Sequence, residues 1–101
     1  MLEHFQHQIL DELEGAKHYI QMAMESRASH PAWAKMFVDM SSAELGHASN
    51  LYKMFNEEVE GLRKVYTNGL PDYIQNIVSD VTKNYTECYA KVKYMHDAYN
   101  K

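Results

Sequence analysis

The sequence has few of the residues that interrupt helices or that mark other classes of protein. Its 101 residues include only 4 glycines and 2 prolines, which favours long helices. The single cysteine, Cys88, excludes an intrachain disulfide and fits a reducing compartment. No apolar run approaches the roughly 18 residues of a membrane-spanning helix, and the first ten residues lack the pattern of a secretory signal. We therefore expect one cytoplasmic domain, residues 1–101, with no membrane partner.

Positive charge is also scarce. Lys and Arg total 10 against 14 Asp and Glu, which gives a formal net charge of -4, and no basic run occurs. This balance argues against a nucleic-acid partner. Hydrophobic residues make up 46% of the chain, which is ample for a packed core.

Apolar residues recur at spacings of three and four in three long segments, and this period predicts an all-α protein. Pro31 suits the first position of the second helix, and Gly61 is a plausible stop for it. The short link before Pro31 predicts that the first two helices form an antiparallel hairpin. Pro71 opens the third helix. The predicted helices cover about residues 2–27, 31–60 and 71–99.

An acid and an imidazole interrupt the apolar stripe of the second helix. Glu44 and His47 lie three residues apart and therefore share one helix face. A buried carboxylate costs free energy unless a partner or a metal ion compensates its charge. On the first helix, Glu12 follows the apolar register, whereas Glu14 belongs to a polar stripe. The apolar residues that share the stripe of Glu44 and His47 are Trp33, Met36, Phe37, Met40, Leu51, Met54 and Phe55.

Glu-x-x-His on one helix, with a Glu from its neighbour, is how di-iron carboxylate bundles build a metal site. One chain offers Glu12, Glu44 and His47, which is about half of the ligands that such a site uses. Two copies of the hairpin, related by a two-fold axis, would supply the full set. The sequence therefore predicts a four-helix bundle that is completed by homodimerisation, with the site at the interface. Carboxylate-rich ligation suits iron, and also Mn or another hard divalent ion, better than Zn.

These residues resemble the ferritin-like superfamily, in which a Glu followed seven residues later by an aromatic precedes an E-x-x-H helix. Here Tyr19 follows Glu12 at that distance. The half-length form is most similar to the encapsulated ferritins, helical hairpins that complete their ferroxidase centre as dimers. The similarity covers about residues 5–60, including LDELEGAKHYIQMA and AELGHASNLYKMF.

The resemblance implies a ferroxidase that binds two irons per dimer and oxidises Fe(II) with oxygen or peroxide, for iron storage or detoxification. By the same resemblance the metal ligands and catalytic residues are Glu12, Glu44 and His47, with Tyr19 behind them and Asp11 and Glu14 near the mouth of the site. It also implies larger assemblies of dimers and an encapsulin shell as partner, inside which the protein would be a nanocompartment cargo. No docking tail follows the third helix before Lys101.

Two other interpretations stay open. The same site could scavenge peroxide, although the cysteine pairs of a rubredoxin-like electron donor are missing. Alternatively, the chain is a structural or assembly module in which Glu44 and His47 make polar contacts across an interface without metal. Metal binding distinguishes the two classes, because the structural interpretation predicts none.

Overall fold

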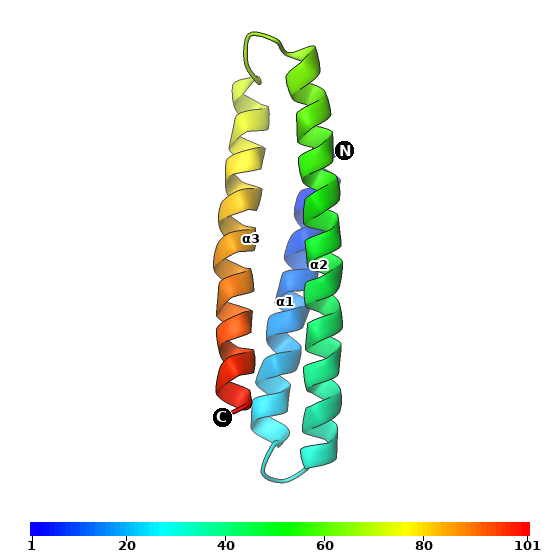
Figure 1. The fold of residues 1–101 in the computed structure, drawn as a ribbon, viewed down its shortest axis with the longest axis vertical. Coiled ribbons are helices and arrows are strands. Elements are labelled where there is room, and N and C mark those ends of the chain that lie inside the picture. The colour runs from blue at the N-terminus through cyan, green and yellow to red at the C-terminus, as the bar shows by residue number, and fades with distance from the viewer.

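The computed structural model describes residues 1–101 as three α-helices without strands, which confirms the predicted all-α class (Figure 1). The helices are α1 (Leu2–Ser26), α2 (Pro31–Val65) and α3 (Asp72–Tyr99). Pro31 begins α2 as expected, because its fixed φ suits a first helical position and it needs no amide donor there. None of the three helices has a stretch apolar and long enough to cross a bilayer.

The predicted end of the second helix was wrong. Gly61 does not end α2, which continues for one more turn to Val65. That turn is kept because Leu62 packs against the core and Arg63 forms an ion pair with Glu60 at 3.2 Å. The chain turns instead at Gly69, whose φ of 109° a residue with a side chain rarely adopts.

The helices form an elongated molecule of 57 × 17 × 16 Å. α1 and α2 make the predicted antiparallel hairpin, and α3 runs back beside α1 (Figure 1). α2 and α3 approach each other much less closely. Aromatic side chains fill the space between them, where the rings of Tyr52 and Tyr85 stack with centroids 4.0 Å apart. One broad face of the α1–α2 hairpin therefore has no third helix against it.

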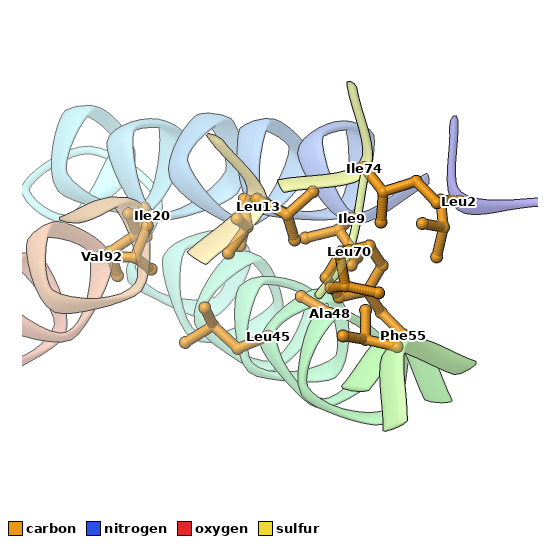
Figure 2. Packing of buried hydrophobic residues seen from close by; sticks show 14 of the residues in the cluster. Leu2, Ile9, Leu13, Ile20, Leu45, Ala48, Phe55, Leu70, Ile74 and Val92 are labelled. Carbon is orange, nitrogen blue, oxygen red and sulfur yellow. The ribbon is translucent and has the colours of Figure 1, made fainter. Parts of the chain in front are cut away.

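All three helices contribute apolar side chains to one core, and Figure 2 shows the labelled members converging from the helices and, for Leu70, from the segment before α3. Leu13, Ile20, Phe55 and Val92 are almost completely shielded from solvent. The core residues are Leu2, Ile9, Leu13, Ala16, Ile20, Ala23, Ala34, Leu45, Ala48, Phe55, Val59, Leu70, Ile74, Val81 and Val92.

One polar contact joins the three helices inside this core. The Ser41 hydroxyl on α2 donates to the Ala16 carbonyl of α1 at 2.6 Å, and its oxygen lies 2.8 Å from His96 Nε2 on α3. Because the single hydroxyl proton is directed to Ala16, the imidazole is the donor in the second bond. Ser41 and His96 are the only buried polar side chains, and both are satisfied.

Candidate metal centre

Glu12, Glu44 and His47 come together on the open side of the hairpin. Glu44 and His47 are one turn apart on α2, and Glu12 reaches them from α1. One ligand atom from each residue lies within 4.8 Å of the others. His47 Nδ1 is 3.4 Å from Glu12 Oε2 and 3.8 Å from Glu44 Oε1. These separations are longer than strong hydrogen bonds, but they bring two carboxylates and an imidazole around a common point.

The two carboxylates repel each other unless something positive lies between them. A side-chain hydrogen bond with Glu12 raises the pKa of Glu44, and partial burial and the negative charge of Glu12 raise it further. His47 acts in the opposite direction, but it is the smallest of these influences. Without metal, the Glu44 carboxyl therefore keeps its proton to a higher pH than an isolated carboxyl would. A metal cation can take the place of that proton, because both supply positive charge at the same point.

The cluster lies at the surface of a single chain. The side chain of His47 is 58% exposed, and those of Glu12 and Glu44 are each 27% exposed. A groove of about 410 Å³ lies over the cluster and is lined by Gln8, Asp11, Glu12, His47, Asn50 and Leu51. The ligand atoms can thus be reached from solvent, or by a second protein chain.

The donors fit iron. Carboxylate oxygens with one imidazole nitrogen are the ligands of hard divalent ions of the first transition row, whereas structural zinc sites use mainly Cys and His. The only cysteine, Cys88, lies on α3 and is not part of the cluster. Glu12, Glu44 and His47 would hold the metal, and one chain supplies three of the roughly six ligands that a di-iron bundle uses.

The three residues predicted to surround the candidate ligands lie in different places in the structure. Asp11 lines the groove over the cluster, whereas Glu14 is exposed outside it. Tyr19 stacks on Phe37 of α2, with ring centroids 6.3 Å apart, and so packs the hairpin two turns along α1 from Glu12. Tyr19 is not part of the cluster that Glu12, Glu44 and His47 form.

Sequence reasoning missed two polar residues that line the groove. Gln8 is one turn before Glu12 on α1, and Asn50 is one turn after His47 on α2. Their positions at i-4 and i+3 from a ligand were the signal that could have found them, because residues at these spacings share a helix face.

Comparison with known proteins decides the family. The family model described as Rubrerythrin matches residues 6–101, which include all three helices. The chain belongs to the rubrerythrin family. Rubrerythrin domains are ferritin-like and bind iron, so the ferritin-like part of the sequence prediction is confirmed. The match to the rubrerythrin family extends through α3, beyond residues 5–60 on which the resemblance was based. The encapsulated-ferritin subfamily stays a prediction. No curated protein and no solved structure matches the chain.

Proposed function

We propose that this rubrerythrin-family protein oxidises Fe(II) at a di-iron centre formed between two copies of the chain. Glu12, Glu44 and His47 of each copy would hold one iron, giving two per dimer. The observation that carries the proposal is that these three side chains converge on the one hairpin face that α3 leaves open. A four-helix bundle places its metal ligands on such facing surfaces.

The surface around His47 supports a second copy as the partner. At about 100° per residue, four large side chains of α2 lie within roughly 40° of His47 around the helix. They are Trp33, Met36, Met40 and Met54, and between 41% and 62% of each is exposed. Trp33, Met36 and Met40 follow one another at three and four residues, the spacing of the seam along which helices pair, and Met54 lies two turns beyond His47 on the same side. Apolar residues flanking a half-set of ligands fit a partner that brings the other half, and a two-fold copy does so.

The residues have separable roles in this reaction. Glu12 and Glu44 supply the negative charge that attracts Fe(II), and metal binding favours the deprotonated form of both carboxyls. His47 supplies one neutral nitrogen. Fe(II) held by these three residues would be the substrate. Two Fe(II) ions would each lose one electron, and dioxygen would take both electrons with two protons to give hydrogen peroxide. With peroxide as oxidant, the same two electrons and two protons give two waters. The oxidised iron would pass to storage or detoxification.

Titration of metal-free protein with Fe(II) under anaerobic conditions, followed by addition of oxygen, tests this function. We expect saturation near one iron per chain and a rapid rise in the ferric-oxo absorbance. Glu12→Ala and Glu44→Ala should abolish both. Glu87→Ala is the control, because Glu87 is an exposed acid on α3, away from the cluster. Wild-type protein without saturable iron binding would refute the proposal.

The alternative without metal has one observation in its favour. His47 already lies within ion-pair distance of both Glu12 and Glu44, so a protonated imidazole would satisfy the cluster by itself. A structural module of this kind predicts that Glu44→Ala leaves a dimer folded or more stable, and that iron changes nothing. Peroxide scavenging at the iron site is distinguished by comparing oxidation rates with peroxide and with oxygen.

A further inference from the structure

One glycine in the middle of α1 lies directly beside the metal-ligand cluster. Gly15 is on the turn after Glu12, and an ideal Cβ built on it would lie 2.9 Å from Glu44 Oε2. The Cδ and Cγ atoms of Glu44 would be 3.5 and 3.7 Å away. Real Cβ atoms essentially never approach another heavy atom as closely as 2.9 Å. The Glu44 carboxylate thus occupies the space that any side chain at position 15 would need.

The backbone gives no other reason for glycine at this position. Gly15 lies within α1, and Gly69 is the only glycine with positive φ. A glycine inside a helix is less stable than alanine, because it loses more conformational freedom on folding. The atoms nearest to the added Cβ all belong to the Glu44 side chain, so close packing of the two helix backbones does not require the glycine either. By contrast, Gly46 and Gly61 of α2 have no atom within 4 Å of an added Cβ.

We propose that Gly15 is a positioning residue of the metal centre, whose missing side chain lets the Glu44 carboxylate lie against α1 and meet Glu12. This inference rests on the proposed function, because it assigns Gly15 a role in the same site. Alanine at position 15 would have to move the Glu44 oxygen from 2.9 Å to an ordinary contact of about 3.4 Å, a displacement of about 0.5 Å. Metal ligands tolerate deviations of only about 0.2 Å from their preferred distances.

The methyl group should leave the fold intact, because it meets the mobile end of a side chain rather than backbone. We therefore expect Gly15→Ala to fold and dimerise as the wild type does, and to bind Fe(II) roughly 10- to 100-fold more weakly, the range typical when the support of a ligand is lost. Gly46→Ala is the matched control. It makes the same change in a helix, between Glu44 and His47, with open space above it, and should leave Fe(II) affinity unchanged.

The experiment combines anaerobic calorimetric Fe(II) titration, sedimentation and thermal unfolding of metal-free protein. In a Glu44→Ala background, where the obstructing carboxylate is gone, Gly15→Ala should raise the midpoint of unfolding as Gly46→Ala does. This measurement needs no metal. If Gly15→Ala does not fold, or if it lowers the midpoint in that background, another atom is obstructed and the inference is wrong.

The outcomes separate this inference from the proposed function. Unchanged Fe(II) affinity in Gly15→Ala, with a wild type that binds iron, overturns the role of Gly15 alone. Weaker binding in a variant that has become monomeric overturns it in favour of packing between copies. A wild type that binds no iron refutes the proposed function, whatever the variants do.

Discussion

The buried hydroxyl of Ser41 holds the register in which Glu12, Glu44 and His47 meet. It donates to the carbonyl of Ala16 on α1 and accepts from His96 on α3. Ser41 is one turn before Glu44 on α2, and Ala16 is one turn after Glu12 on α1. Replacing Ser41 by alanine removes the contact that fixes α1 and α2 against each other next to the ligands.

The cost of Ser41→Ala follows from what it leaves behind. The Nε2–H of His96 would lose its acceptor in a place where the side chain is only 8% exposed. A buried polar group without a partner costs about 1–3 kcal/mol of unfolding free energy. For a chain of 101 residues each kcal/mol lowers the midpoint of thermal unfolding by roughly 4–8 °C. We therefore expect Ser41→Ala to lose about 1–3 kcal/mol of unfolding free energy.

Thermal and urea unfolding, followed by circular dichroism at one fixed protein concentration, measures this loss. Ser42→Ala is the control, because Ser42 is the exposed neighbour on the same turn and should change stability by no more than about 0.5 kcal/mol. Adding His96→Leu to Ser41→Ala should recover part of the loss, since removing both polar partners is less costly than leaving one unpaired. Equal stability of Ser41→Ala and Ser42→Ala would show that the hydrogen bonds of the Ser41 hydroxyl do not stabilise the fold.

Two further predictions concern pH and assembly. Burial lowers the pKa of His96 below its ordinary value near 6.5, helped by Lys93 and opposed by Asp97. The unfolded chain therefore takes up this proton at a higher pH than the folded chain. The contribution of His96 to the unfolding free energy is fully present above pH 6.5 and is lost as the pH falls below it. If the unfolding free energy changes equally from pH 6.5 to 5.5 in wild type and in His96→Asn, this prediction is wrong. Met36→Glu should weaken the dimer at least about tenfold, because burying an unpaired charge costs more than the roughly 1.4 kcal/mol that a factor of ten represents. Tyr94→Glu on α3 is the control in sedimentation, and equal dimerisation of both variants would move the interface elsewhere.

Local signals in the sequence were enough to predict the helices. The three-and-four spacing of apolar residues gave three elements, and Pro31 marked the start of α2 because its ring fits that position. The end of α2 was missed, since Gly61 only weakens a helix and the packing of Leu62 outweighs that cost. His96 was missed for a related reason. It lies one turn after Val92 in the apolar stripe of α3, but a histidine is buried there only because Ser41 supplies a partner from another helix.

The candidate ligands Glu44 and His47 were predictable because the E-x-x-H spacing is local to one helix, whereas their surroundings depend on tertiary structure. Periodicity indicates that a face of α2 is apolar, but not which neighbour covers it. Of the apolar residues that share the stripe of Glu44 and His47, Phe55 packs inside the chain, whereas Trp33, Met36, Met40 and Met54 stay exposed. The close approach of Gly15 to Glu44 joins two helices and has no signature in either one.

Metal binding and dimerisation should reinforce each other if the two half-sites form one centre. If the second copy of the chain raises the affinity for iron, bound iron must strengthen dimerisation by the same factor, because iron binding and dimerisation are thermodynamically linked. Each tenfold gain in affinity for one iron strengthens the dimer by about 1.4 kcal/mol, so two ions contribute about 2.8 kcal/mol, or a factor of roughly 100. Sedimentation of a dilution series, with and without anaerobic Fe(II), measures this factor. Glu44→Ala should show no iron dependence. Iron that saturates the wild type without tightening the dimer would place a complete site within each chain, and Glu12, Glu44 and His47 would then need further ligands from water rather than from a second copy.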